Sequence, residues 1–237
     1  MSIILTGFTS AIGRALLERY VKEKKTVFCL GRKDLESLNK FKNIDFKKFF
    51  FIDFNSHSFD LDLDKLLNQL NHEEIETIVH LAAESGKRQG IRSNSYEDVK
   101  NLINVNHLNS AWFMKESCDL LSRSKKTNKS FVYISTQLAK YKGPGLSIYS
   151  SSKAAMNNLC LSLAHEYGSA GIRVNIVTPG IVATNPNHAD FDMEKLNIPL
   201  SRLATPKDVV NAVYFLSSKK SEYITGANLD VNGGRWD

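Results

Sequence analysis

The chain has 237 residues, of which 42% are hydrophobic and 24% charged, close to the globular average. Its net charge of +6 favours phosphorylated ligands, but the basic residues form no stripe of the kind that nucleic-acid binding needs. No apolar run is long enough to span a membrane, and Cys29, Cys118 and Cys160 are too scattered for a disulfide framework or a metal site. Because the chain opens on an apolar strand-like run and not on a signal peptide, we expect a cytoplasmic protein.

Short apolar or β-branched runs alternate along the chain with segments of helical period. The predicted strands are Ile3–Leu5, Val27–Leu30, Phe49–Asp53, Thr77–Leu81, Phe131–Ile134, Arg173–Thr178 and Asn228–Val231. The predicted helices are Ile12–Lys22, Asp34–Phe41, Leu63–Leu70, Tyr96–Leu121, Ser150–Tyr167 and Pro206–Ser217. This alternation predicts an α/β fold, a Rossmann-like doubly wound parallel sheet with helices on both faces.

No repeat or linker divides the chain, so we expect a single domain over residues 1–237. The least regular segment, Ala183–Leu200, follows the sixth predicted strand. Open α/β sheets bind ligands at the carboxyl ends of their strands. We therefore interpret this segment as a lid in preference to a plain surface loop.

The segment Thr6–Gly13 reads TGFTSAIG, directly after the first predicted strand and at the start of a helix. Glycines at this place permit a tight turn and a close approach of the backbone to a pyrophosphate. The helix N-terminus offers free N–H groups and the positive end of its dipole to the same group. We expect a dinucleotide-binding turn.

The end of the second predicted strand, which reads Leu30-Gly31-Arg32-Lys33, indicates which dinucleotide binds. An acidic residue there would hydrogen-bond the ribose 2′-hydroxyl of NAD, whereas Arg32 can hold a 2′-phosphate with a fork of donors. The first acid, Asp34, has the character of a helix N-cap. The sequence predicts NADP(H) over NAD(H).

Tyr149 and Lys153 stand four residues apart, which places them on one face of the predicted helix. A neighbouring ammonium favours the phenolate and lowers the pKa of a tyrosine, which can then act as a general acid or base. The hydroxyls of Ser135 and Thr136, at the end of the fifth strand, can reach the same place and hold a substrate oxygen.

These motifs together resemble the classical short-chain dehydrogenase/reductase family over nearly the whole chain, from Ile3 to Gly234. The family's glycine motif matches Thr6, Gly7 and Gly13, and its closing strand resembles Ile224–Gly234. The resemblance implies a catalytic tetrad of Asn106, Thr136, Tyr149 and Lys153, with Ser135 as the fallback hydroxyl. It implies cofactor-binding roles for Gly7, Thr9, Ser10, Ile12, Gly13, Arg32, Asp53, Ala82, Tyr149, Lys153, Pro179, Gly180, Val182 and Thr184.

The resemblance implies reversible hydride transfer between a nicotinamide and a carbonyl carbon. Tyr149 would protonate the alkoxide, and Thr136 would hydrogen-bond the same oxygen. Lys153 would bind the nicotinamide ribose and lower the pKa of Tyr149, while Asn106 would hold a water that feeds a proton relay. The implied substrate is a small carbonyl or alcohol compound, a ketone or a 3-oxoacyl compound above all, and no metal is required.

The sequence departs from the family pattern at three places. Ala11 replaces the middle glycine of the turn, where its methyl could crowd the cofactor, and Thr136 replaces the usual serine. The fourth strand ends His80-Leu81-Ala82-Ala83, as in extended members that act on nucleotide sugars, although we interpret His80 itself as structural. A sugar or sugar-nucleotide reductase or epimerase, and a non-catalytic NADP(H)-sensing protein, therefore remain alternatives.

Family members assemble as dimers or tetramers through their fourth and fifth helices. In this chain those helices carry Trp112, Phe113, Met156 and Leu159 beyond one core stripe. These residues indicate a homodimer or homotetramer, or else packing within the monomer.

Overall fold

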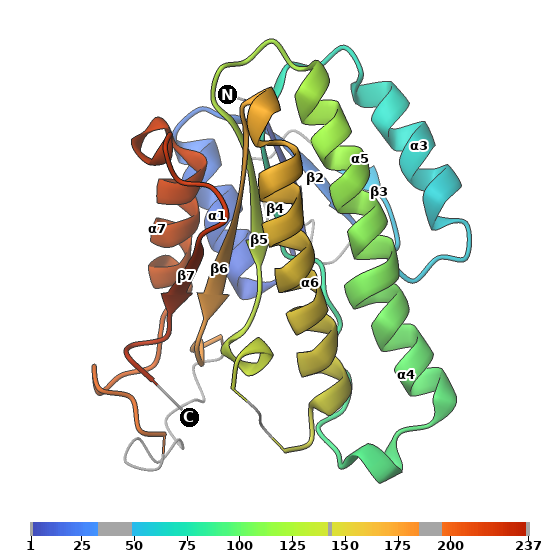
Figure 1. Ribbon diagram of the computed structural model, residues 1–237, viewed down its shortest axis with the longest axis vertical. Helices are drawn as coiled ribbons and strands as arrows, with labels where there is room; N and C mark the ends of the chain where they lie inside the picture. The colour runs from blue at the N-terminus through green and yellow to red at the C-terminus, as the bar shows by residue number, and fades with distance from the viewer. Residues whose placement is uncertain (1, 33–48, 142–143, 185–195, 236–237) are drawn as a thin grey trace.

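The computed structural model describes residues 2–32, 49–141, 144–184 and 196–235. A seven-stranded parallel sheet in the order β3-β2-β1-β4-β5-β6-β7 forms its centre (Figure 1). The strands are β1 (Ser2–Thr6), β2 (Thr26–Gly31), β3 (Phe49–Phe51), β4 (Ile75–His80), β5 (Lys129–Ile134), β6 (Ile172–Pro179) and β7 (Asn228–Val231). The central strands are almost entirely buried, as near-continuous apolar runs require. The predicted doubly wound sheet is confirmed.

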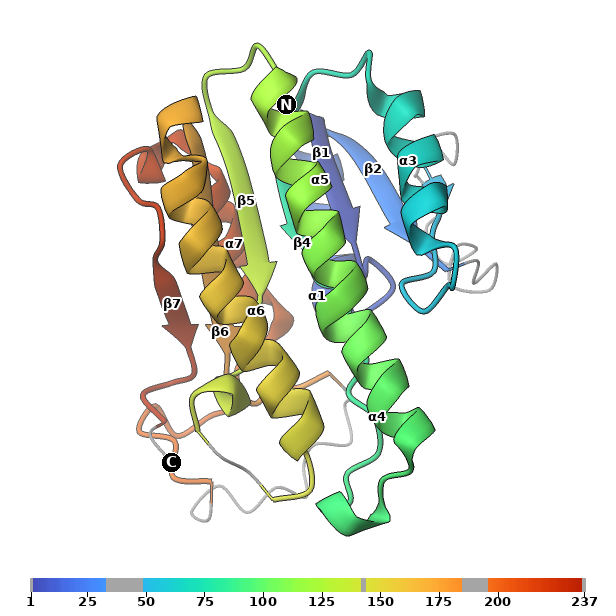
Figure 2. The same ribbon diagram turned by 45° about the vertical axis from the view of Figure 1, so that its right-hand side comes forward.

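Helices cover both faces of this sheet. They are α1 (Ala11–Lys22), α3 (Phe59–Leu70), α4 (Tyr96–Ile103), α5 (Asn109–Arg123), α6 (Ser147–Glu166) and α7 (Pro206–Ser217). Figure 2 shows α3, α5 and α6 on one face, with α1 and α7 on the other. Each face buries its own apolar core, around Phe113 and Phe131 on the first and around Leu16 and Val213 on the second. None of the helices described here has the length and apolar character that crossing a membrane would take.

Local side-chain caps fix where several helices begin. Ser10 accepts a hydrogen bond from the backbone of α1, and Ser95 and Thr205 form capping boxes with Asp98 and Asp208 at α4 and α7. Such caps satisfy backbone N–H groups that a helix start leaves free. The cap on α1 sets the helix start directly behind the glycine turn.

The predicted helix Asp34–Phe41 lies outside the described residues. Three other predicted helices differ in detail from the structure, and the first of them, Leu63–Leu70, begins four residues earlier, at Phe59. The predicted helix Tyr96–Leu121 is continuous, but a π-helical turn at Asn104–Leu108 separates α4 from α5. The predicted helix Ser150–Tyr167 begins three residues earlier, at Ser147, so Tyr149 lies in its first turn.

Strand order places a crevice above β1. The chain runs outward from β1 through β2 to β3 on one side, and from β4 to β7 on the other. The connections therefore diverge above the carboxyl ends of β1 and β4, which is where open α/β sheets bind their ligands.

Candidate active site at the carboxyl edge of the sheet

The turn between β1 and α1 can be built only with glycine at two positions. Gly7 has φ +65°, and a Cβ there would lie 2.8 Å from the carbonyl carbon of Leu81. A Cβ on Gly13 would lie 2.3 Å from the Gly7 oxygen. Ser10 closes the turn, because its Oγ donates to the Gly7 oxygen at 2.9 Å and accepts from the Gly13 nitrogen at 3.1 Å. Because these glycines have no side chains, a ligand that binds above the turn can approach its backbone closely.

A cavity of about 860 Å³ opens beside this turn. It is lined by six of the predicted cofactor residues, Gly7, Thr9, Ser10, Arg32, Asp53 and Ala82. Arg32 is exposed at the end of β2, and Asp53 follows β3 with Oδ1 accepting from the Asn55 nitrogen at 2.9 Å. A glycine cradle, a helix N-terminus and a nearby guanidinium fit the adenosine and pyrophosphate half of a dinucleotide.

Sequence reasoning missed a large part of this cavity. The missed lining residues are Phe8, Gly31, Ile52, Phe54, Asn55, Leu81, Ala83, Glu84, Gly86, Lys87, Gln89, Asn94, Asp98, Asn101, Leu102 and Val105. The residues next to the ends of β2, β3 and β4 could have been found from strand position alone. The wall from Glu84 to Val105 has no motif that marks it.

The predicted catalytic tyrosine and threonine lie close together at the carboxyl edge of the sheet. Tyr149, in the first turn of α6, and Thr136, two residues after the end of β5, lie close enough for their side chains to interact. Burial raises the pKa of Tyr149, and the hydrogen bond with Thr136 opposes that rise. The fallback residue Ser135 is buried, and its Oγ has no hydrogen-bond partner among the described residues.

Lys153 lies one turn further along α6 and is only 2% exposed. Its Nζ donates to the Ile134 oxygen at 2.7 Å and stands 4.3 Å from the centroid of the Tyr133 ring. Burial lowers the pKa of Lys153 to about 7. Sequence reasoning expected Lys153 to lower the pKa of Tyr149. In the structure that pKa is raised by burial, and the group that opposes the rise is Thr136.

Asn106 lies in the π-helical turn and is buried. Its Nδ2 donates to the Glu84 oxygen at 2.7 Å and to Ser152 Oγ at 3.3 Å, while its Oδ1 accepts from the Glu84 nitrogen at 2.8 Å. The amide therefore ties the segment after β4 to α6. Both of its N–H groups are engaged by protein, so only an acceptor position of its side chain is left for the expected water.

The predicted nicotinamide-side segment, Pro179–Thr184, leaves the end of β6. The Gly180 nitrogen donates to the Val231 oxygen at 3.0 Å, and Val182 forms an isolated bridge with Ala204. Neither this segment nor Ile12, Gly13, Tyr149 and Lys153 lines the large cavity. Of the predicted lid Ala183–Leu200, residues 185–195 lie outside the described part of the chain.

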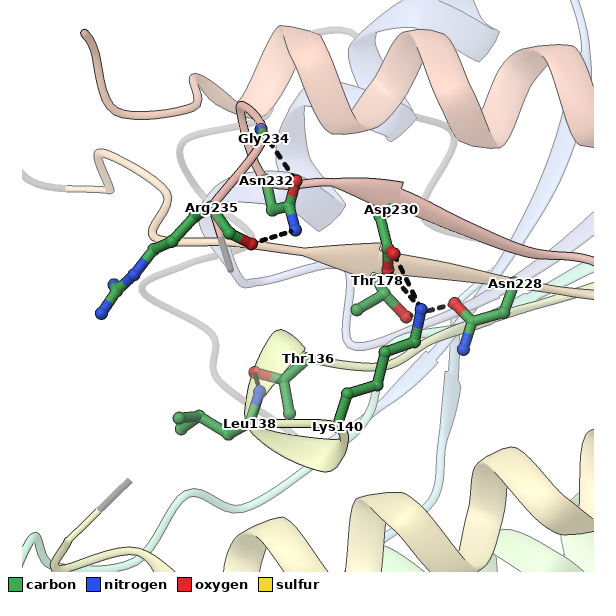
Figure 3. A network of polar contacts seen from close by, with 9 residues as sticks. All are labelled: Thr136, Leu138, Lys140, Thr178, Asn228, Asp230, Asn232, Gly234 and Arg235. Atoms are coloured by element: carbon green, nitrogen blue, oxygen red, sulfur yellow. Dashed lines mark hydrogen bonds and ion pairs between the residues drawn. The ribbon is translucent and has the colours of Figure 1, made fainter. Parts of the chain in front are cut away.

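Polar contacts hold the strand ends on this side together (Figure 3). Lys140 forms an ion pair with Asp230 at 2.7 Å, and Thr178 donates to Asn228 at 2.5 Å. Thr136 lies beside them at the start of the short helix Gln137–Ala139. The loop that carries the predicted catalytic hydroxyl is thereby fastened to β7.

His80, the distinctive residue at the end of β4, is fully buried, with hydrogen bonds at both ring nitrogens. Burial, and secondarily the charge of Lys153, lowers its pKa to about 3. It is a neutral part of the core, as interpreted from the sequence. No group of three or more potential metal ligands occurs among the described residues.

Comparisons with known proteins place this geometry in context. A family model described as enoyl-(acyl carrier protein) reductase matches residues 7–235. The 3-oxoacyl-[acyl-carrier-protein] reductase FabG of Buchnera aphidicola subsp. Schizaphis graminum is 33% identical over 96% of this chain and 84% of its own length. The FabG protein of Haemophilus influenzae is 30% identical over 98% and 96%. A solved short chain dehydrogenase/reductase family protein superposes with a TM-score of 0.83 at 25% identity, over 99% of this chain and 96% of its own.

Proposed function

Because the chain belongs to the short-chain dehydrogenase/reductase family, it is an oxidoreductase that uses a nicotinamide cofactor, and we propose that it reduces a 3-oxoacyl thioester with NADPH. The observation that carries the proposal is the contact between Thr136 and Tyr149, one helical turn from buried Lys153, at the edge of the sheet where the glycine turn lines a cavity of about 860 Å³. The 3-oxoacyl class is supported by the similarity to two FabG reductases along nearly the whole chain.

A bound nicotinamide supplies the hydride, and the protein handles the proton and the developing charge. Tyr149 donates its phenolic proton to the substrate oxygen, and Thr136 donates a hydrogen bond to the same atom. Burial raises the pKa of the Tyr149 phenol above its ordinary value and so favours the protonated form. A phenol in that form is an acid, which favours the direction of reduction.

Lys153 serves as the second donor of the site. Its ammonium has three N–H bonds, and the Ile134 carbonyl accepts one of them. We assign one further N–H to the nicotinamide ribose hydroxyls. Asn106 keeps the Glu84 backbone and Ser152 in place around this lysine's helix.

The choice of NADPH over NADH depends on Arg32. Its exposed guanidinium lines the cavity at the end of β2, where a 2′-phosphate would lie. Asp53, also in the cavity wall, is engaged by the Asn55 backbone and follows β3, one strand further from β1. This arrangement supports a 2′-phosphate partner more strongly than a 2′-hydroxyl partner.

The alternatives have weaker support. His80, which suggested enzymes of nucleotide sugars, is explained by its hydrogen bonds within the core. A cofactor sensor would leave the contact between Thr136 and Tyr149 without a purpose. A dimer or tetramer is supported on the outer helix faces, where Trp112 is 42% exposed, whereas Phe113 and Met156 belong to the monomer core. Buried free cysteines fit a reducing cytoplasm.

The test is the oxidation of NADPH by the purified full chain with acetoacetyl-CoA and longer 3-oxoacyl thioesters. Tyr149→Phe should lower kcat by about 100- to 10,000-fold and leave NADPH binding within about twofold of the parent. The matched control is Tyr96→Phe, because Tyr96 is 83% exposed. NADPH binding without turnover of any carbonyl compound would favour the sensor, and turnover of sugar nucleotides alone would refute the 3-oxoacyl assignment.

A further inference from the structure

A row of three side chains crosses the centre of the sheet beneath the proposed active site. Thr6 ends β1 and His80 ends β4, and the pairing of Leu5 with Val79 sets these two residues side by side. His80 in turn pairs with Tyr133 on β5. Because the strands are parallel and in register, the three side chains emerge on the same face of the sheet, the face that α5 and α6 cover.

Hydrogen bonds fix the middle of this row. Thr6 Oγ1 accepts from the Leu81 and Ala82 nitrogens at 3.0 Å each, so its proton is donated to His80 Nδ1 at 2.8 Å. His80 therefore carries its proton on Nε2 and donates it to Ser110 Oγ at 3.0 Å. Because both ring nitrogens are hydrogen-bonded, the His80 imidazole has one orientation. An aromatic ring that stacks on it is fixed in a matching orientation.

Tyr133 stacks on this fixed imidazole. The two ring centroids are 5.8 Å apart and the ring planes differ by 28°. Tyr133 is 1% exposed, and its hydroxyl has no hydrogen-bond partner among the described residues. The hydroxyl therefore does not explain why an aromatic side chain stands here.

Lys153 explains it. The ammonium lies 4.3 Å from the centroid of the Tyr133 ring, within the range in which a cation is attracted to an aromatic face. In the part of the chain that the structure describes, Lys153 forms no ion pair, and its ammonium donates a hydrogen bond to the Ile134 carbonyl. An attraction to the ring is strongest for such a desolvated cation.

We propose that Tyr133 is a positioning residue, whose ring face, held by His80, keeps the Lys153 ammonium charged and aimed at the cofactor. The proposal rests on the proposed role of Lys153 in catalysis. One N–H of the lysine is held by the Ile134 carbonyl and a second meets the ring, which leaves the third for a ribose hydroxyl.

The surroundings of Lys153 make its protonation a direct measure of this contact. Its titratable neighbours are Tyr133 on β5, His80 on β4 and Cys160 on α6, and Tyr149 acts on Tyr133 from the start of α6. Burial raises the pKa of Tyr133 and Cys160 and lowers that of His80, so all three are neutral near pH 7. The ring face and the Ile134 carbonyl are then the neighbours that favour the charged amine.

The experiment reduces the negative charge on the face of the aromatic ring at position 133 and keeps the shape of the ring. The full chain is labelled with ¹³Cε-lysine, and the Lys153 resonance is identified by its loss in Lys153→Met and titrated by NMR. Position 133 carries tyrosine, phenylalanine (Tyr133→Phe) or trifluorophenylalanine, whose fluorines withdraw charge from the ring face. The control places trifluorophenylalanine at Phe131, which is on the same strand and in the same core; among the described residues the ring that the Lys153 ammonium faces is Tyr133 and not Phe131.

Tyr133→Phe should leave the Lys153 pKa within about 0.3 units, because the ring face is retained, whereas trifluorophenylalanine at position 133 should lower it by about one unit. In NADPH-dependent turnover, the loss of activity at high pH should move to lower pH by the same amount. A shift as large in the Phe131 control, or no shift with fluorination at position 133, would overturn the proposal. The NMR titration needs no turnover, so a failure of the proposed function gives a different result from a failure of this inference.

Discussion

Replacing Thr136 by valine tests the proposed site most directly, because valine keeps the shape of threonine and removes only the hydroxyl. That hydroxyl interacts with Tyr149 and accepts a weak hydrogen bond from the Leu138 nitrogen at 3.4 Å. The long contact contributes little to stability, so Thr136→Val should fold with a Tm close to that of the parent.

Two effects of Thr136→Val should combine in the chemical step. A substrate oxygen that gains charge loses one positioned donor, which typically costs about 100- to 1,000-fold in kcat. The pKa of Tyr149 also rises further, because the contact that opposes the effect of burial is removed. We therefore expect kcat to fall at least 100-fold, with little change in the Kd for NADPH.

The assay is steady-state NADPH oxidation with a 3-oxoacyl thioester, with two companion variants. Thr136→Ser keeps the hydroxyl and should retain most of the activity. Ser135→Ala removes a buried hydroxyl that has no partner in the described structure, and should leave both activity and stability nearly unchanged. The reasoning is refuted if Ser135→Ala loses more activity than Thr136→Val, because the roles of the two hydroxyls would then be exchanged.

Three further predictions concern the cofactor and the core. Arg32→Ala should weaken NADPH binding about 10- to 100-fold and NADH binding less than twofold; equal losses would contradict the 2′-phosphate role. Lys153→Met should abolish turnover yet raise Tm by several degrees. Burial lowers the lysine pKa to about 7, so the penalty is complete below that pH and fades as pH rises toward the ordinary lysine value; an equal gain at pH 6 and pH 10 would contradict this cause. Arg173→Met should cost about 2–3 kcal/mol in urea unfolding, because Arg173 donates to the Leu216 oxygen at 2.7 Å and to Asn128 at 3.1 Å; a loss below about 0.5 kcal/mol would show these bonds to be dispensable.

The sequence was sufficient for the sheet and for the glycine turn. Buried strands are read from apolar runs, because both faces of a parallel sheet are covered. The roles of Gly7 and Gly13 are predicted from their place between the first strand and the first helix. The structure requires glycine at both, because backbone atoms lie within 3 Å of where a Cβ would be. Both signals are local, so neither depends on knowing how the strands pair.

Other features depend on long-range packing and could not be predicted. The π-helical turn at Asn104–Leu108 has the same apolar spacing as ordinary helix over so short a stretch, so periodicity does not reveal it. The cavity wall from Glu84 to Val105 is a polar segment brought to the cofactor crevice only by the connection after β4. The hydrogen bonds of Asn106 to Glu84, across 22 residues, follow from the same connection.

The electrostatic state of the proposed catalytic pair, Tyr149 and Lys153, also depends on how the chain folds. Spacing alone suggested that an ammonium at Lys153 would favour a phenolate at Tyr149. The fold buries both groups, and burial acts on each in the direction of its neutral form, raising the pKa of the phenol and lowering that of the amine to about 7. A neutral phenol beside an amine near half-protonation suits proton donation to a substrate more than proton removal from one. The same exclusion of water that makes Lys153 costly to the fold thus also sets the protonation states of the two proposed catalytic groups.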